Sequence, residues 1–141
     1  MTRTSPLDRQ AAIDLVQKFM PLTRGSASRV ILANLPPRAL RRFYESAAAE
    51  VIAAGLGGDW EEFRRRAQAA RRAGVLTAIG ELDAGALGIS APVFGNDASI
   101  LGSISLVISA APTAADAALV THLERCVRAA GTTISEALRG D

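Results

Sequence analysis

The sequence predicts a single α+β domain built around an antiparallel sheet. Residues with helical spacing dominate the chain up to Ala73, strand-like alternation follows from Val75, and one long helical stretch closes the sequence. Two β-rich runs lie five residues apart, which is typical of a hairpin and makes them antiparallel neighbours. Because helices and strands come in separate runs, the pattern favours α+β over alternating parallel units. The 141 residues, 49% of them hydrophobic, suffice for one core.

Two helices are predicted in the first half of the chain, after an irregular start. Residues 11–16 (AAIDLV) are interpreted as a strand, with a helical turn as the alternative. Residues 30–35 are interpreted as the apolar face of a short helix that ends at a pair of prolines. From residue 38 to 53, apolar residues recur every three or four positions. Pro37 suits the first position of that helix and Gly55 suits its exit.

A further helix is predicted from Trp60 to Ala73. Asp59, with Glu62 three residues later, forms a capping box at its start, and Gly74 marks its end. The arginines of this helix resemble a basic stripe for nucleic acid, but glutamates four residues before two of them favour a solvated helix face. These arginines are Arg64, Arg65, Arg66, Arg71 and Arg72.

Three strands and a long helix complete the chain. The strands are predicted at residues 75–80, 86–94 and 100–109, the last two joined by the loop GNDAS. Thr113 and Asp116 resemble a second capping box, so a helix is expected to follow. Its apolar stripe is predicted to consist of Leu119, Leu123, Val127, Ala130, Ile134 and Leu138.

The predicted hairpin has one apolar face and one face of small residues. Side chains alternate across a sheet, so Leu87, Ile89 and Val93 lie beside Ile104 and Leu106 on a surface that the long helix can cover. The small face is either an ordinary exposed sheet surface or the base of a pocket, where small side chains leave room for a ligand. It carries Ala86, Gly88, Ser90 and Pro92 on one strand, and Leu101, Ser103, Ser105, Val107 and Ser109 on the other.

The start of the short helix is bare. Four small residues, Gly25 to Ser28, precede its apolar face. A helix start presents unpaired N–H groups and a partial positive charge, which attract anions where no bulky side chain blocks the approach. Ordinary N-capping explains the same residues equally well. Together with the small hairpin face, they predict one shared hollow suited to a carboxylate-bearing metabolite.

Composition argues against several other classes of protein. A net charge of +2 and an aromatic content of 4% speak against a nucleic-acid surface. The sequence contains no apolar run of the roughly 18 residues that a membrane-spanning helix needs. The lone Cys126 cannot form an internal disulfide, and the N-terminus lacks a secretory pattern, so a cytoplasmic protein is expected.

Catalytic, metal and cofactor sites are not expected. His122 and Cys126 are four residues apart, but two ligands do not make a metal site. Glu81 and Asp83 are interpreted as solvated loop carboxylates rather than as an acid–base pair. The glycines of residues 55–58 follow a helix and precede acidic residues, which favours an interhelical turn over a phosphate-binding loop.

Four stretches of the chain, in this order and spacing, resemble one protein family. They are PLTRGSASRVILANLPP, ARRAGVLTAIGELDAGALGISAPVF, LGSISLVIS and AAGTTISEALRG, and they extend from about Pro21 to Leu138. The chain resembles the C-terminal effector-binding domain of IclR-type bacterial transcriptional regulators. The resemblance implies a GAF-like fold: a curved antiparallel sheet with helices on both sides and a small-molecule pocket on one sheet face. It also implies self-association through this domain, as dimers or tetramers.

The resemblance further implies where the pocket lies. Thr23 stands where family members commonly carry His, Val107 where they often carry Ser, and Ala78 where some pockets carry an acidic residue. These changes make the pocket less polar, so we expect a ligand with an apolar or aromatic part rather than a very small keto acid. The implied ligand-binding residues are Thr23, Gly25, Ser26, Ala27, Ala86, Gly88, Ser105 and Val107.

Regulators of this type begin with a winged helix-turn-helix domain, which the sequence does not contain. We therefore expect residues 1–141 to form a single sensor domain without its N-terminal strands, either excised or naturally shortened. DNA is expected to be contacted only through a helix-turn-helix domain absent from this chain, whose affinity the ligand shifts. The alternative is a structural or oligomerisation module with a vestigial pocket, and ligand binding separates the two hypotheses.

Overall fold

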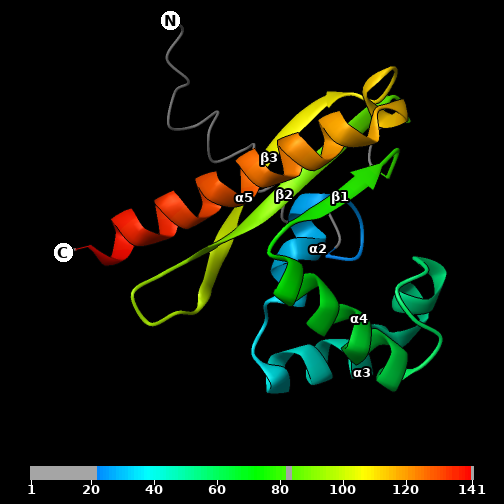
Figure 1. Ribbon diagram of the computed structural model, residues 1–141. Coiled ribbons are helices and arrows are strands. Elements are labelled where there is room, and N and C mark those ends of the chain that lie inside the picture. The colour runs from blue at the N-terminus through cyan, green and yellow to red at the C-terminus, as the bar shows by residue number, and fades with distance from the viewer. Residues whose placement is uncertain (1–21, 82–83, 141) are drawn as a thin grey trace, which may run out of the picture.

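The structure, a computed structural model, describes residues 22–81 and 84–140 and confirms the α+β class (Figure 1). The strand predicted at residues 11–16 lies outside the described residues. Within the described ranges, no helix combines the length and the apolar character that crossing a bilayer requires. The elements are α2 (Ser26–Ala33), α3 (Pro37–Ala53), α4 (Trp60–Ala73), β1 (Leu76–Ile79), β2 (Ala86–Phe94), β3 (Ile100–Ser109), the 3-10 helix η1 (Thr113–Ala115) and α5 (Ala117–Arg139).

The described strands form an antiparallel sheet in the order β1-β2-β3, and the predicted register of the hairpin is confirmed. Ile89 pairs with Leu106, and the neighbouring apolar residues of the two strands pair in the same row. On this row Leu87 and Ile89 have no exposed surface, and they pack with Val127 of α5. The apolar face is therefore covered by the long helix, as the alternation predicts.

The ends of the apolar stripe predicted for α5 are wrong. Val127 is buried, but Leu119, Ile134 and Leu138 are exposed, and the face that meets the sheet continues from Val127 through Gly131 to Ser135. The reason is the close approach of α5 to β2 at Gly131. A Cβ atom at this position would lie 2.9 Å from the Pro92 carbonyl oxygen and 3.0 Å from the Ala91 Cβ, so only glycine fits. Val127, Gly131 and Ser135 are four residues apart and therefore lie in one row along the side of α5 that contacts β2.

Asp116 alone caps the long helix. Its carboxylate accepts a 3.0 Å hydrogen bond from the Leu119 N–H, the bond expected of an N-cap residue. Thr113 instead begins η1 and makes no side-chain cap, so the predicted capping box between Thr113 and Asp116 is wrong. A short 3-10 turn occupies the residues that the box would have used.

A second hydrophobic cluster joins α2, α3 and α4, which lie to one side of the sheet (Figure 1). Leu40 and Val51 of α3 pack with Phe63 of α4, and all three are buried. Tyr44 and Trp60 cover Phe63, with ring centroids 5.5 Å apart for Tyr44 and Trp60 and 5.6 Å apart for Tyr44 and Phe63. The described chain thus has two hydrophobic clusters, one around α5 and the sheet and one around α3 and α4.

The predicted cap of α4 is confirmed at Asp59 and shifted at Glu62. Asp59 accepts a 2.8 Å hydrogen bond from the Glu62 N–H, while the Glu62 carboxylate accepts a 2.9 Å bond from the Gly58 N–H rather than from that of Asp59. The Gly58 hydrogen bond, with the nearby Arg66 guanidinium, lowers the pKa of Glu62. The helix runs from Trp60 to Ala73 as predicted and ends at Gly74, whose φ of 70° is left-handed.

Candidate functional site

The helix α2 lies directly against the small face of the hairpin. Ser26, the first residue of α2, sits over Gly88 of β2. A Cβ atom at position 88 would come within 2.8 Å of the Ser26 Oγ, so the absence of a side chain at Gly88 lets the helix close onto the sheet. The two small-residue surfaces therefore meet, but the Ser26 side chain fills the space directly above Gly88, where the sequence predicted one shared hollow.

Three serine hydroxyls form a hydrogen-bonded chain between α2 and the hairpin. The Ser26 Oγ lies 2.7 Å from the Ser90 Oγ, which lies 2.6 Å from the Ser105 Oγ. Ser90 has no exposed surface, whereas Ser105 is exposed on β3. Each hydroxyl carries one donor, so a chain directed from Ser26 to Ser105 leaves the Ser105 O–H free to donate outward. This chemistry suits a ligand that presents an oxygen acceptor.

The start of α2 already holds a carboxylate, that of Glu81. The Gly25 N–H donates to Glu81 Oε1 at 3.1 Å, and Arg29 Nη1 lies 2.6 Å from Glu81 Oε2. Arg24 Nη2 also donates to the Glu81 backbone oxygen at 2.8 Å. The interpretation of Glu81 as a solvated loop carboxylate is wrong, because its side chain is 29% exposed and is paired with Arg29. The partial positive charge of the helix start is thus met by a residue of the chain itself.

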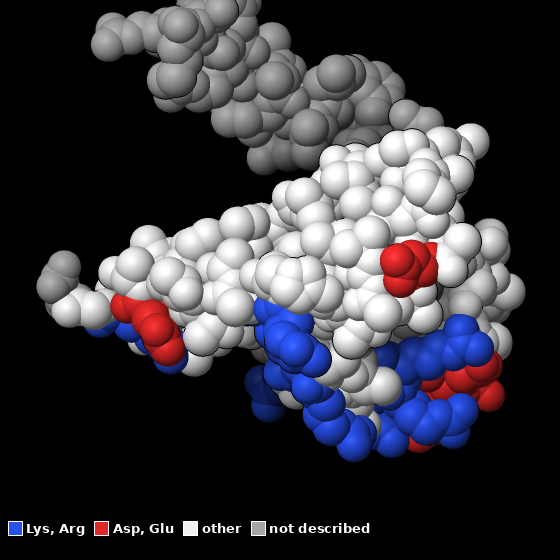
Figure 2. Space-filling view, turned by 45° about the horizontal axis from the view of Figure 1, so that its top comes forward, with Lys and Arg blue, Asp and Glu red and all other residues white. Residues whose placement is uncertain are grey.

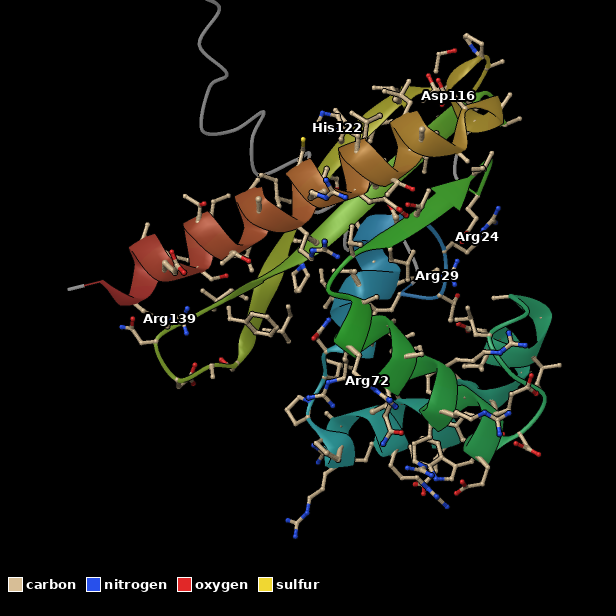
Figure 3. All side chains as sticks on the ribbon, viewed as in Figure 1. Arg24, Arg29, Arg72, Asp116, His122 and Arg139 are labelled. Atoms are coloured by element: carbon tan, nitrogen blue, oxygen red, sulfur yellow. The ribbon has the colours of Figure 1, made fainter. Side chains whose placement is uncertain are left out.

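An open hollow borders this ion pair. It has a volume of about 700 Å³ and extends from the approach to α2 to the end of α3. Figure 3 shows Arg24 and Arg29 close together beside α2. Thr23, one of the predicted ligand-binding residues, is buried at its edge. The lining residues are Thr23, Arg24, Glu50, Ala53, Ala54 and Glu81.

The structure divides the predicted ligand-binding residues between these two neighbouring places. Ser26, Gly88 and Ser105 meet around Ser90, whereas Thr23 and Gly25 lie on the Glu81 side of the helix start. The remaining three residues lie around the first group. Ala27 is half-buried on α2, Ala86 pairs with Ser109, and Val107 pairs with Gly88 while leaving 68% of its own surface exposed.

Sequence reasoning left Ser90, Glu81 and Arg29 out of the site. The alternation of the hairpin places Ser90 on the small face beside Ser105, whereas its hydrogen bond to Ser26 depends on where α2 lies. The pairing of Arg29 with Glu81 had no local signal, because 52 residues separate them along the chain.

The described residues offer no metal site. Within residues 22–81 and 84–140, no group of three or more His, Cys, Asp or Glu side chains gathers around one point. His122 Nε2 lies 3.6 Å from Cys126 Sγ, and both residues are exposed on α5. The candidate site is therefore one of hydroxyls, a guanidinium and backbone N–H groups, all of which can donate hydrogen bonds to an oxygen-bearing ligand.

Comparison of the sequence with protein families gives one match. The family described as bacterial transcriptional regulator IclR, C-terminal, matches residues 8–136, which is most of the chain. No curated protein sequence matches the chain.

Solved structures with the same fold agree with this assignment. The repressor BlcR of Agobacterium tumefaciens is 16% identical with a TM-score of 0.65, over 85% of this chain and 47% of BlcR. An IclR transcriptional regulator of Alicyclobacillus acidocaldarius is 20% identical with a TM-score of 0.65, over 85% of this chain and 46% of that one.

A third structure is the inducer-binding domain of the Acinetobacter transcription factor PobR, as a double mutant in complex with 3-hydroxybenzoic acid. It is 14% identical with a TM-score of 0.61, over 82% of this chain and 66% of that one. The chain thus spans about half the length of BlcR and of the Alicyclobacillus regulator. From the family match and the shared fold, we conclude that the chain belongs to the family of C-terminal domains of bacterial IclR transcriptional regulators.

Proposed function

We propose that the domain senses a small organic acid, with the ligand held on the small face of the hairpin beside α2. The observation that carries the proposal is the serine chain, which ends at an exposed hydroxyl on β3. The buried hydroxyls of Ser26 and Ser90 are satisfied within this chain, whereas the Ser105 hydroxyl at its exposed end can bond a ligand. The PobR domain, which shares the fold, is a precedent for an aromatic acid as inducer.

The ligand class follows from the residues around the serine chain. Val107 presents an exposed apolar side chain next to Gly88, while Ser105 offers a hydroxyl on the same face. This pairing favours an aromatic or otherwise partly apolar acid over glyoxylate or pyruvate. The ligand-binding residues that we propose are those implied by the sequence, Thr23, Gly25, Ser26, Ala27, Ala86, Gly88, Ser105 and Val107, joined by Ser90.

The proposed sensor has two states: in one, Glu81 is bound at the start of α2, and in the other, a ligand has displaced it. A ligand carboxylate reaches the Gly25 N–H and Arg29 only by displacing the Glu81 carboxylate. Displacement would release the loop after β1 from the start of α2. A ligand that binds the released state better shifts the balance between the two states by its differential affinity. In the proposed regulator, a separate winged helix-turn-helix domain reads this shift in the cytoplasm, within a dimer or tetramer.

The test is a thermal-shift screen of a panel of acids with a blocking variant and a matched control. Val107→Trp places a large ring on the proposed site, and its side chain is exposed enough for the replacement to leave the fold intact. Leu101→Trp, on the same strand and 63% exposed, is the control. We expect a hydroxybenzoate or a related aromatic acid to raise the Tm of the wild type and of Leu101→Trp, but not of Val107→Trp. Stronger stabilisation by pyruvate or glyoxylate would contradict the ligand class.

The contacts that fill the site favour a second candidate function, a structural or oligomerisation module. Ser26 rests on Gly88, and Glu81 occupies the helix start, so both predicted surfaces have partners within the chain. This candidate predicts that no acid of the panel raises the Tm, while sedimentation still shows a concentration-dependent dimer. A stabilising acid whose effect disappears in Val107→Trp would exclude it.

A further inference from the structure

A basic hollow lies where the end of α4 meets β2 and α5. Its volume is about 250 Å³, and four of its lining residues are arginines, while no Asp or Glu is among the lining residues. The arginines come from two helices: Arg71 and Arg72 from α4, and Arg128 and Arg139 from α5. The other lining residues are Asn34, Ala73, Gly74, Pro92, Phe94, Thr132 and Ser135.

Unlike Arg41, Arg64 and Arg66, the four arginines of the hollow have no acidic partner among the described residues. Arg41, Arg64 and Arg66 each pair with a glutamate of their own helix. Figure 2 shows this mixture of positive and negative side chains on one part of the surface. The ion pairs of the described residues include none of the four arginines of the hollow.

Most of the donor capacity of the hollow is unused. Arg128 Nη1 donates to the Ala73 carbonyl oxygen at 3.2 Å, and Arg139 Nε donates to the Ser135 carbonyl oxygen at 3.4 Å. The side chains of Arg71 and Arg72 make no hydrogen bond within residues 22–81 and 84–140. Since each guanidinium has five N–H donors, many remain available to a ligand.

Helix dipoles explain only part of this arrangement. Arg71 and Arg72 lie in the last turn of α4, and Arg139 in the last turn of α5, where a cation is stabilised by the negative end of the helix. That effect acts on each helix separately. It accounts neither for Arg128, in the middle of α5, nor for the meeting of both helices around one hollow without an acidic residue.

We propose that this hollow binds a small anion bearing phosphate groups. Guanidinium groups match phosphate oxygens with paired hydrogen bonds, and several of them favour a multiply charged anion over a monocarboxylate. The volume fits a compact group such as a diphosphate, and the converging walls give it contacts from α4 and α5 at once. The proposal is independent of the sensor function, because the hollow shares no lining residue with the proposed effector site.

The experiment measures inorganic pyrophosphate binding by calorimetry at low salt, with the whole chain. The variant is Arg72→Gln, and the matched control is Arg65→Gln, which removes an exposed arginine of the same helix that lies outside the hollow. We expect Arg72→Gln to weaken binding about tenfold or more, as the loss of a charged hydrogen-bond donor does, and Arg65→Gln to change it less than about twofold. Unliganded Tm values that match the wild type show that both variants fold.

Two results of the pyrophosphate titrations would overturn the proposal. One is the absence of pyrophosphate binding to the wild type. The other is equal weakening in Arg72→Gln and Arg65→Gln, which indicates attraction to overall charge rather than to the hollow. A short DNA duplex tests the remaining source of phosphate. If the duplex binds through Arg72 and pyrophosphate does not compete with it, the surface binds nucleic acid and the small-anion proposal is wrong.

Discussion

Ser90 lies in the middle of the sheet with no exposed surface, and its hydroxyl has two hydrogen-bond partners, both of them serine hydroxyls. A buried hydroxyl costs stability unless it is bonded, so Ser26 and Ser105 satisfy it from either side. The three residues belong to α2, β2 and β3, and they fix the position of the helix start over the hairpin. At the scale of single residues, the chain of serine hydroxyls and the ion pair between Glu81 and Arg29 shape the candidate site.

We expect Ser90→Ala to lower the free energy of unfolding by about 1–3 kcal/mol, because it leaves the Ser26 hydroxyl buried without its partner. Urea unfolding followed by circular dichroism measures the change. The control is Ser103→Ala, two residues from Ser105 on the same strand, which makes no side-chain hydrogen bond within the described ranges and should stay within about 0.5 kcal/mol of the wild type. Equal effects would show that the serine chain contributes nothing.

The Glu81 ion pair gives a second prediction at this scale. Glu81→Gln removes the charge that faces Arg29 at 2.6 Å, and we expect a loss of about 1 kcal/mol in the free energy of unfolding. The matched control is Glu45→Gln, whose ion pair with Arg41 is mostly exposed and should be worth less than about 0.5 kcal/mol. If the two losses are the same, Glu81 does not hold the start of α2.

At the scale of elements, the structure decides where α5 begins and how it meets the sheet. Asp116 caps the helix, although Thr113 stands in an equally suitable sequence context. Along the helix, contact with β2 passes through Gly131 and Ser135, so small residues rather than the largest apolar ones set the packing. For the cap and for the close contact, we expect a substitution to lower the stability of the domain.

Asp116→Ala should destabilise the domain by about 1 kcal/mol, since it removes the side chain that accepts from the Leu119 N–H. Thr113→Ala should change stability by only a few tenths of that amount, because Thr113 makes no cap. Thermal unfolding of the two variants in parallel measures this difference. A larger loss for Thr113→Ala would restore the capping box that the sequence indicated.

Gly131→Ala should cost about 1–3 kcal/mol in spite of the higher helix propensity of alanine. Its Cβ would lie 2.9 Å from the Pro92 carbonyl oxygen, which belongs to the backbone of a central strand and has little room to move. Thr133→Ala, at an exposed position of the same helix, should be neutral or slightly stabilising by the same unfolding measurement. A stabilising effect of Gly131→Ala would show that α5 packs less closely than described.

At the scale of the whole molecule, α2 is the main connection between the two hydrophobic clusters. Phe63 belongs to the cluster of α3 and α4, and Val127 belongs to the cluster of α5 and the sheet. Helix α2 touches β2, β3 and α4, so it connects the two parts. Both proposed sites lie at such junctions: the effector site between α2 and the hairpin, and the basic hollow between α4, β2 and α5.

This division predicts that the two parts open separately. Phe63→Ala should weaken the α3–α4 part by about 3–5 kcal/mol through the cavity that it creates. Hydrogen exchange followed by mass spectrometry should then show faster exchange in residues 37–73 and nearly unchanged exchange in residues 86–109. Uniform acceleration over both ranges would show instead that the domain unfolds as one unit.

Much of this fold could be predicted from local patterns in the sequence. Helical spacing and glycine and proline signals gave α4 its ends at Trp60 and Ala73, and strand alternation gave β2 and β3 their ends and their register. These features depend on residues a few positions apart, whose preferences tertiary contacts here reinforce. The small face of the hairpin, including Ser90, could be predicted for the same reason.

The sequence by itself determined the α+β class, the sheet register and the surface on which α2 rests, because these depend on periodicity within each element. Only the tertiary structure decided that Glu81 occupies the start of α2, that the buried face of α5 includes Gly131, and that four arginines line one hollow. Those contacts join residues that lie far apart along the chain. No local pattern carries information about which distant side chain a folded backbone will bring near.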